Sequence, residues 1–209
     1  MAKRALTVRD IRSYEPSLLS FDGAWQAAVG QPEMTGSWLV WGSSANGKTR
    51  FALQLAKYLC RFGKVAYDSL EEGLSLSMQR AIAEVGFSDS EVKRNFILLD
   101  KESIADLILR LKKQRSPQIV IIDSLQYTGM NYTDYKTLRD TFRNKLFIFI
   151  SHAEGQNPKG NVGKAVRYDA FVKIYVEGYK AFPQSRYGGG EAYTIWEKGA
   201  ADYYGNTQQ

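Results

Sequence analysis

The chain has 209 residues, of which 44% are hydrophobic and 24% charged, a balance typical of one globular domain with a sizeable core. The sequence has no internal repeat, no low-complexity tract and no apolar run near the roughly 20 residues that cross a bilayer. The formal net charge of +6 permits a polyanionic partner without requiring one. Cys60, the one cysteine, lies among apolar residues and is expected in the core. We therefore expect a cytoplasmic protein with no membrane contact and no secretory signal.

The first 35 residues differ in composition from the rest of the chain. Basic side chains precede Pro16, and Gly23 and Pro32 interrupt the segment further. This composition predicts that residues 1–35 form an N-terminal extension that packs on the core, with short helices at most. From 36 to 209, apolar runs alternate with helical patterns, which is typical of an α/β domain.

Seven strands are expected in the second segment, with helices between the first five. The predicted strands are Ser37–Trp41, Lys64–Asp68, Phe96–Leu99, Ile119–Ile122, Leu146–Ile150, Phe171–Val176 and Glu191–Trp196. The predicted helices are Lys48–Phe62, Leu74–Val85, Ile104–Gln114 and Tyr135–Asn144. Continuous apolar strands separated by helices favour a mostly parallel, twisted sheet flanked by helices. The last two strands have no predicted helix between them and are expected to extend one edge antiparallel. The long loops after Ser151 and Gly178 are interpreted as functional or mobile.

Residues 42–49 read Gly-Ser-Ser-Ala-Asn-Gly-Lys-Thr and match the phosphate-loop pattern G-x-x-x-x-G-K-[ST] at every fixed position. A predicted strand precedes the loop and a predicted helix follows it, a context in which backbone N–H groups and a helix N-terminus bind phosphates. Lys48 is expected to reach the β- and γ-phosphates, and the Thr49 hydroxyl to ligate Mg²⁺. A glycine-serine turn that matches by chance is the alternative. The predicted nucleotide-binding residues are Gly42, Ser43, Ser44, Ala45, Asn46, Gly47, Lys48, Thr49 and Arg50.

Acidic side chains follow two of the predicted strands. Asp123 ends the β-branched run Ile119–Ile122, so it is expected at the same sheet edge as the phosphate loop, where it would bind a water of the Mg²⁺ shell. Capping a turn is its alternative role. Glu71 and Glu72 follow the strand Lys64–Asp68, and either carboxylate can activate the water that attacks ATP. Alternatively, both only favour the N-terminus of the next helix.

A polar pair and a basic loop follow the strand Leu146–Ile150. His152, the one histidine of the chain, is expected to hydrogen-bond the γ-phosphate, although a lone histidine is usually structural. The loop 155–167 combines glycines with basic side chains, which suits contact with nucleic acid phosphates. An ordinary solvated loop is the alternative. The predicted nucleic-acid-binding residues are Lys159, Lys164 and Arg167.

In this order and spacing, the motifs resemble the ATPase core of the RecA superfamily, with the closest resemblance to its RadA, DnaB and KaiC branches. Asp123-Ser124-Leu125-Gln126 resembles the second nucleotide motif of RadA-type ATPases. Ser69-Leu70-Glu71-Glu72 is similar to the catalytic-glutamate segment of DnaB and KaiC, and Ser151-His152 to their sensor position. Ser185-Arg186-Tyr187-Gly188 resembles a basic motif that, in this branch, reaches a neighbouring subunit's ATP. The resemblance spans roughly residues 36–200.

The resemblance implies an Mg²⁺-dependent ATPase that forms a homo-oligomer, either a ring or a filament, and acts on DNA in recombination or replication. It implies that the DNA is single-stranded, that Glu71 is favoured over Glu72 as the base, and that Arg186 acts on the neighbour's nucleotide. It also places the strand Leu146–Ile150 between those that carry the phosphate loop and Asp123. DNA would contact the loops near residues 127–134 and 155–167.

Three other functions are weighed against this one. A KaiC-like regulatory ATPase would share the site, but its output would be a protein contact rather than DNA. A small-molecule kinase would need an arginine-rich lid and an acceptor pocket, and neither is evident in the sequence. A non-hydrolysing assembly subunit is disfavoured because Lys48, Glu71 and Asp123 are all present.

Overall fold

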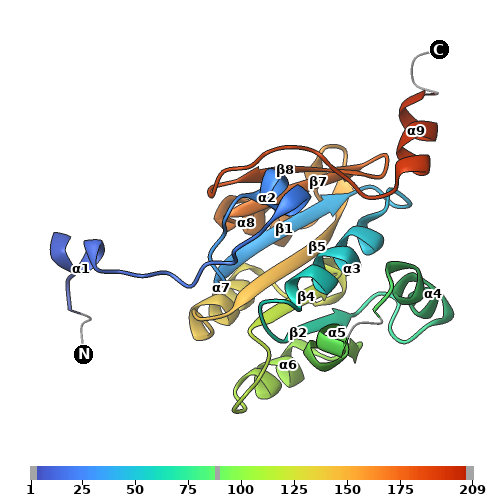
Figure 1. The fold of residues 1–209 in the computed structure, drawn as a ribbon. Helices are drawn as coiled ribbons and strands as arrows, with labels where there is room; N and C mark the ends of the chain where they lie inside the picture. The colour runs from blue at the N-terminus through green and yellow to red at the C-terminus, as the bar shows by residue number, and fades with distance from the viewer. Residues whose placement is uncertain (1–3, 88–89, 206–209) are drawn as a thin grey trace.

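The computed structural model of the chain describes residues 4–87 and 90–205. Within them, strands β1 to β9 belong to one sheet, in the spatial order β3-β2-β4-β5-β1-β7-β8-β9, and β6 pairs with β5 beside that path (Figure 1). Their bounds are β1 Gly36–Gly42, β2 Val65–Ser69, β3 Phe96–Asp100, β4 Ile119–Asp123, β5 Leu146–Glu154, β6 Asn157–Pro158, β7 Val172–Glu177, β8 Lys180–Ser185 and β9 Tyr193–Thr194. The predicted α/β class with a mostly parallel sheet is confirmed.

The register of the sheet places β5 between β4 and β1. Leu146 pairs with Gly36 on one side and with Ile119 on the other, and all three strands are parallel. The prediction of an inserted strand is therefore confirmed. One part of the edge prediction is wrong, because β7 runs parallel to β1, with Trp38 opposite Val172. Only β8 and β9 add antiparallel strands at that edge.

Helices cover both faces of the sheet (Figure 1). One face carries α2 (Gly23–Val29), α3 (Lys48–Leu59), α4 (Leu76–Val85) and α5 (Ser90–Asn95). The other carries α6 (Ile104–Leu111), the short helix η1 (Leu125–Tyr127), α7 (Tyr132–Thr141) and α8 (Gly160–Asp169). The last helix, α9 (Glu197–Gly205), follows β9. In the described part of the chain, no helix is both long enough and apolar enough to cross a membrane.

Two hydrophobic clusters fill the spaces between the sheet and its helices. Alternate residues of a strand point to opposite faces, so Trp38 joins the cluster beneath α3 and Leu39 joins the one beneath α7 and α8. Every residue of β4 is buried, as are six of the seven residues of β1. Each fully buried large apolar side chain contributes about 1.5–3 kcal/mol, so the strands that end at the site are anchored by the burial of their side chains.

The segment before β1 has two parts. Residues 17–35 pack on the core, where Leu19 and Phe21 are buried and Met34 donates a backbone hydrogen bond to Ser17. Helix α1 (Val8–Arg12), closed by a capping box between Thr7 and Asp10, has no buried residue and stands apart from the sheet (Figure 1). Residues 1–3 and 206–209 of the two predicted segments lie outside the described residues.

Two predicted loops contain regular structure. Helix α8 begins at Gly160, inside the expected loop 155–167. It forms because Val162, Val166 and Ala170 make an apolar stripe that packs against the sheet. The helix makes the β5–β7 connection a parallel crossover. The expected loop after Gly178 is β8, in which alternate residues are buried. The predicted strand Glu191–Trp196 is reduced to the two residues of β9.

Candidate functional site

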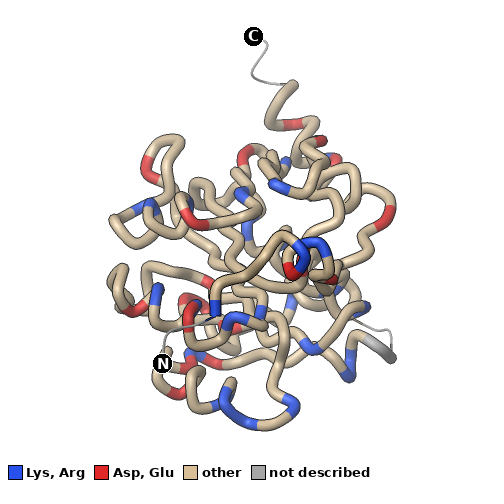
Figure 2. Tube along the Cα trace, turned by 90° about the vertical axis from the view of Figure 1, so that its left-hand side faces the viewer, with Lys and Arg blue, Asp and Glu red and all other residues tan. Residues whose placement is uncertain are grey.

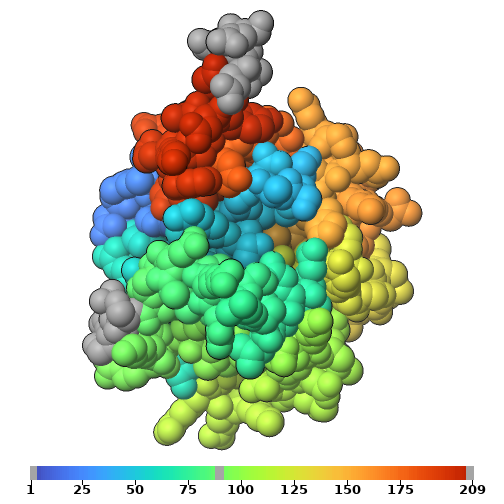
Figure 3. Space-filling view, turned by 90° about the vertical axis from the view of Figure 1, so that its right-hand side faces the viewer, coloured from blue at the N-terminus to red at the C-terminus, as the bar shows by residue number. Residues whose placement is uncertain are grey.

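A pocket of about 270 Å³ lies where β1, β2, β4 and β5 end. Figure 3 views this side of the molecule, with the phosphate loop between α9 and the segment after β2. The structure brings together ten of the fourteen residues that the sequence predicted for nucleotide chemistry, and the other four, Gly42, Ser43, Asn46 and Arg186, do not line the pocket. The pocket is lined by Ser44, Ala45, Gly47, Lys48, Thr49, Arg50, Glu71, Glu72, Asp123 and His152.

Two fixed positions of the phosphate loop, Gly42 and Gly47, require glycine for different physical reasons. A Cβ atom at Gly42 would lie 2.1 Å from the backbone oxygen of Val176, so only glycine permits this approach of β1 to β7. Gly47 has a φ of +92° and directly precedes α3, a conformation that side-chain-bearing residues rarely adopt. The loop therefore curls before the helix N-terminus, and the helix dipole points at the pocket.

Side chains of the loop hold its shape. Lys48 Nζ donates to the Ser43 backbone oxygen at 2.7 Å, and Asn46 Nδ2 donates to Ser44 O at 2.9 Å. Asn46 Oδ1 accepts from the Gly178 backbone N–H at 2.7 Å, which ties the loop to the turn between β7 and β8. Burial lowers the pKa of Lys48, and the charges of Asp123 and Glu71 oppose that effect. An anion in the pocket would further favour the charged ammonium.

Asp123 lies at the floor of the pocket, 7% exposed. The pKa of its carboxyl is raised to about 6, chiefly by burial. The Tyr67 hydrogen bond and the Lys48 charge lower this pKa, whereas the charges of Glu71 and Glu72 raise it. The Tyr67 hydroxyl donates to Asp123 Oδ2 at 2.5 Å. The Asp123 backbone oxygen accepts from the N–H groups of Leu70 and Glu71, which fixes the segment that carries both glutamates.

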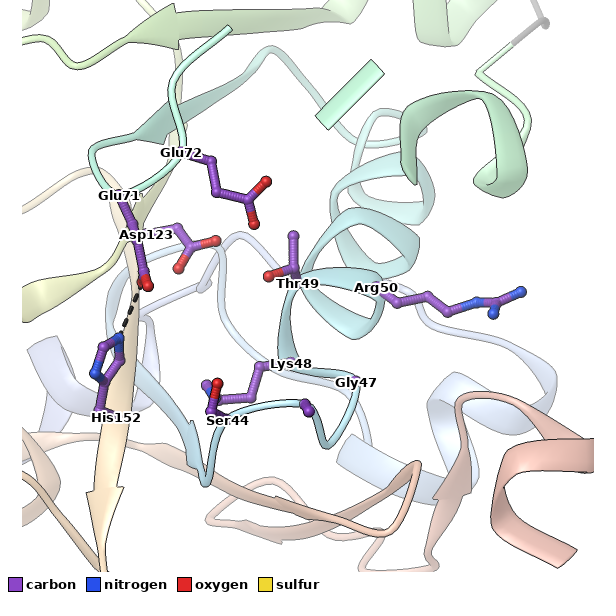
Figure 4. Close-up of a pocket in the computed structure, with 10 residues that line it drawn as sticks. Ser44, Gly47, Lys48, Thr49, Arg50, Glu71, Glu72, Asp123 and His152 are labelled. Atoms are coloured by element: carbon purple, nitrogen blue, oxygen red, sulfur yellow. Dashed lines mark hydrogen bonds and ion pairs between the residues drawn. The ribbon is translucent and has the colours of Figure 1, made fainter. Parts of the chain in front are cut away.

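Glu71 and Glu72 make different contacts although they are adjacent. Glu71 Oε2 lies 2.9 Å from His152 Nε2 (Figure 4). The same oxygen accepts from the Ser124 hydroxyl at 3.3 Å. Glu72 instead accepts from the Ser77 hydroxyl at 2.6 Å, in the first turn of α4. Glu71 is thus held against the β5 side of the pocket, and Glu72 beside the next helix.

Gln126, the last residue of the predicted motif Asp123-Ser124-Leu125-Gln126, joins three parts of the site, although the sequence assigned it no role of its own. Its Oε1 accepts from the His152 backbone N–H at 3.0 Å. Its Nε2 donates to Ser151 Oγ at 2.8 Å and to the Lys159 backbone oxygen at 3.1 Å. One side-chain amide therefore links the end of β5 to the start of α8.

The predicted basic residues lie outside the pocket, at and along α8. Lys159 directly precedes the helix, and its backbone N–H donates to His152 O at 2.8 Å. A second hollow of about 480 Å³ is lined by Asn157, Lys164, Arg167, Tyr168 and Lys173. Tyr168 is 84% exposed. Arg167 lies over the Trp41 ring at 5.0 Å, and Trp41 immediately precedes the phosphate loop.

Arg186 lies at the opposite edge of the sheet from the pocket of its own subunit. Ser185 pairs with Val172, the first residue of β7, and the Arg186 guanidinium lies 4.9 Å from the centre of the Phe171 ring. Figure 2 views this end of the molecule, where Lys and Arg lie among Asp and Glu. Arg186 therefore cannot serve the pocket of its own chain in this conformation.

The donor set of the pocket determines which groups it can hold. A lysine, a helix N-terminus and a curled backbone fit a chain of phosphates. The Thr49 hydroxyl and the Asp123 carboxylate are hard oxygen ligands, which suit Mg²⁺ when phosphates and water complete its shell. Over residues 4–87 and 90–205, no group of three or more His, Cys, Asp or Glu side chains could hold a metal by itself. The residues present therefore fit a metal that arrives with a phosphate ligand.

Comparisons with known proteins agree with the architecture. No protein-family model matches the chain, and no curated protein matches it. The flagellar accessory protein FlaH from Methanocaldococcus jannaschii is 14% identical with a TM-score of 0.62, over 87% of this chain and 96% of that one. A KaiC-like protein from Pyrococcus horikoshii is 17% identical with a TM-score of 0.60, over 86% and 92%. The chain thus has the expected RecA-like fold, and this likeness does not select the RadA or DnaB branch.

Proposed function

We propose that this protein binds ATP with Mg²⁺, hydrolyses it, and uses the cycle to act on DNA as a homo-oligomer. One observation carries the proposal: Lys48, Thr49, Glu71, Asp123 and His152, from four separate segments, converge on one pocket at the carboxyl edge of a RecA-like sheet. In parallel α/β sheets, ligands bind at this edge. Residues 36–209 form the proposed ATPase domain, and residues 1–35 its extension.

Phosphate binding follows from charge and backbone geometry. The curled loop and the α3 N-terminus present N–H groups, and Lys48 adds a positive charge facing the β- and γ-phosphates. Thr49 and Asp123 would hold Mg²⁺, which supplies positive charge to the phosphate oxygens when bound. The Tyr67 hydrogen bond and the Lys48 charge favour the ionised form of Asp123, the form in which its carboxylate would bind Mg²⁺ or a water of the Mg²⁺ shell.

Hydrolysis requires a group that orients water and accepts its proton. Glu71 has this role in our proposal, since its carboxylate is positioned by His152 and Ser124 at the pocket wall. His152 contacts the terminal phosphate in the same proposal. Glu72 is committed to Ser77 and is the second choice.

The basic hollow on α8 supports DNA as the output. Lys164, Arg167 and Lys173 supply charges for a phosphate backbone, and the exposed Tyr168 ring offers a stacking surface for a base. Two contacts join this hollow to the nucleotide site. The Arg167 guanidinium lies over the ring of Trp41, next to the phosphate loop. Gln126 hydrogen-bonds both His152 and Lys159, the residue that precedes α8.

A KaiC-like regulatory ATPase is the second candidate. The N-terminal segment that contains α1 favours this candidate. Four of its apolar side chains are each more than 60% exposed, namely Leu6, Val8, Ile11 and Tyr14. Apolar side chains of this number on one segment are typical of a protein contact. In that case the output would be a protein partner instead of DNA.

Oligomerisation is proposed from the position of Arg186. A head-to-tail arrangement places the edge that carries Arg186 against the pocket edge of the next subunit. There the guanidinium would meet charge developing on the γ-phosphate, an effect worth roughly 10³–10⁵ in rate in other phosphate-loop enzymes.

The test is the ATPase rate with and without single-stranded DNA, at two protein concentrations. Lys48→Ala should lose most ATP affinity, while Glu71→Gln should bind ATP and lose turnover. Lys57→Ala is the matched control, a cation of the same helix whose Nζ contacts Val85 O away from the pocket. Stimulation by DNA supports the DNA role, and a rate per subunit that rises with concentration supports a shared site. Full hydrolysis by Glu71→Gln would reassign the base to Glu72, and unchanged binding by Lys48→Ala would overturn the proposal.

A further inference from the structure

We infer that Arg50 and Trp196 form a stacking platform for the purine base of the bound nucleotide, which deepens the proposed function and rests on it. The platform lies where the C-terminal segment meets the phosphate loop. Its supporting residues are Gly47, Tyr179, Ile195 and Gly199.

The direction of the nucleotide follows from the two ends of the pocket. Glu71 and His152 stand at one end, where the terminal phosphate must lie if Glu71 positions the attacking water. Lys48 and the start of α3 occupy the middle. Arg50 extends from the other side of α3, away from the Glu71–His152 pair (Figure 4). The nucleoside therefore leaves the phosphate loop past Arg50.

The C-terminal segment forms a wall at that end. A Cβ atom on Gly47 would lie 3.0 Å from the Tyr179 ring and 3.7 Å from Ile195 Cγ2, so both side chains border the loop. The Tyr179 and Trp196 rings are perpendicular, with centres 5.1 Å apart. The Arg50 guanidinium carbon lies 5.4 Å from the centre of the Trp196 ring.

Hydrogen bonds and close packing hold this wall in place. Ile195 N–H donates to Tyr179 O at 2.9 Å, and Gln54 Nε2 of α3 donates to Ile195 O at 3.1 Å. A Cβ atom on Gly199 would come within 2.2 Å of the Trp196 ring, so α9 is packed directly against that ring. A preformed wall of this kind costs little ordering entropy when a ligand binds.

The wall has unused binding capacity. Trp196 keeps 37% of its surface exposed despite these contacts. Arg50 Nε is buried and, over the described residues, has no hydrogen-bond partner. A buried donor without an acceptor is costly. The Arg50 side chain is 33% exposed and its ion pair is long, 3.8 Å from Nη1 to Glu84 Oε2, so its exposed part can meet a base or ribose oxygen.

The chemistry of the wall selects a class of base. Aromatic faces and a guanidinium bind a base through its π-surface, and this attraction grows with ring area instead of depending on the pattern of donors and acceptors. Purines are the larger bases. We expect ATP and GTP to bind alike, and both to bind more tightly than UTP.

Tripolyphosphate separates the platform from the phosphate site, because it carries the phosphates without a base. Calorimetry on the full chain should show roughly tenfold tighter binding of ATP than in Trp196→Leu, while tripolyphosphate binds both proteins equally. Trp196→Phe, which keeps an aromatic packing partner, should fall between them. Phe182→Leu is the matched control, since Phe182 is 38% exposed on β8.

The outcomes distinguish the two proposals. Equal ATP affinity in wild type and Trp196→Leu, with tripolyphosphate bound by both, would overturn the platform and leave the nucleotide site intact. Equal affinity of the wild type for ATP and UTP would overturn the selection for purines. Loss of tripolyphosphate binding in Trp196→Leu would assign the ring a structural role in the loop instead. No binding of ATP or tripolyphosphate to the wild type would overturn the proposed function together with this inference.

Discussion

Replacement of Asp68 by asparagine should stabilise the protein at neutral and alkaline pH. Asp68 is fully buried at the end of β2. Its Oδ1 accepts from the Glu102 backbone N–H at 3.1 Å, and its Oδ2 has no hydrogen-bond partner over the described residues. Burial raises the pKa of this carboxyl to about 7, with the Glu102 N–H and the Arg110 charge lowering it and the Glu102 charge raising it.

The sign of the effect follows from where each state loses its proton. The unfolded chain releases the Asp68 proton near pH 3.8 and the folded chain near pH 7. Between these values the folded state binds the extra proton, so stability falls as the pH rises and the loss is complete above pH 7. At about 1.36 kcal/mol per pH unit, the interval from 3.8 to about 7 corresponds to at most about 4 kcal/mol. Local relaxation lowers this, and we expect about 2–4 kcal/mol.

Asparagine keeps the acceptor for Glu102 N–H and cannot ionise. Urea unfolding at pH 4, 6 and 8 should therefore show Asp68→Asn close to wild type at pH 4 and more stable at pH 8. Asp202→Asn, an exposed carboxylate on α9, is the control and should track wild type throughout. A constant difference between Asp68→Asn and wild type across this pH range would refute the reasoning, because it would show that the Asp68 carboxyl does not titrate there.

Three further predictions concern the contact between β1 and β7, the basic residues at α8 and the shared ATP site. Gly42→Ala should lower the melting temperature sharply, because its Cβ would lie 2.1 Å from Val176 O and overpacking costs about 1–3 kcal/mol or more; an unchanged transition would mean that β7 moves away freely. Neutralising the three predicted DNA contacts, Lys159, Lys164 and Arg167, should weaken binding to single-stranded DNA and flatten its salt dependence, while basal ATPase activity persists. An unchanged salt dependence would mean that DNA binds elsewhere on the protein. Arg186→Ala and Lys48→Ala, each inactive alone, should recover partial ATPase when mixed, and no recovery despite shown co-assembly would remove Arg186 from the neighbour's site.

The central sheet could be predicted because its strands are continuous apolar runs. Ile119–Ile122 is buried on both faces, so its sequence has no competing periodicity. Helix α8 was missed because Gly160 and Gly163 resemble loop composition, although Val162 and Val166 already show helical spacing. Strand β8 was missed because Pro183 suggests a break, and an antiparallel strand near the sheet edge tolerates it.

The members of the site could be predicted better than its geometry. The spacing of the phosphate loop and the strand-end position of Asp123 depend on local pattern, and local pattern is visible in one sequence. The contact of Tyr67 with Asp123, and that of Asn46 with Gly178, join residues far apart in the chain. A buried tyrosine needs an acceptor for its hydroxyl, but the sequence alone does not say which carboxylate provides it.

The position of β1 in the sheet has a consequence during synthesis. Its neighbours are β5 and β7. Gly36 therefore cannot pair until Leu146 has been synthesised, and Trp38 cannot pair with β7 until Val172 has been synthesised. Pairing across such sequence distances is slow. Until more than two thirds of the chain has left the ribosome, β1 is an apolar segment with two open edges, and such segments recruit chaperones or aggregate. Nascent chains that stop before β5 should therefore be unable to retain nucleotide, although they already contain the whole phosphate loop.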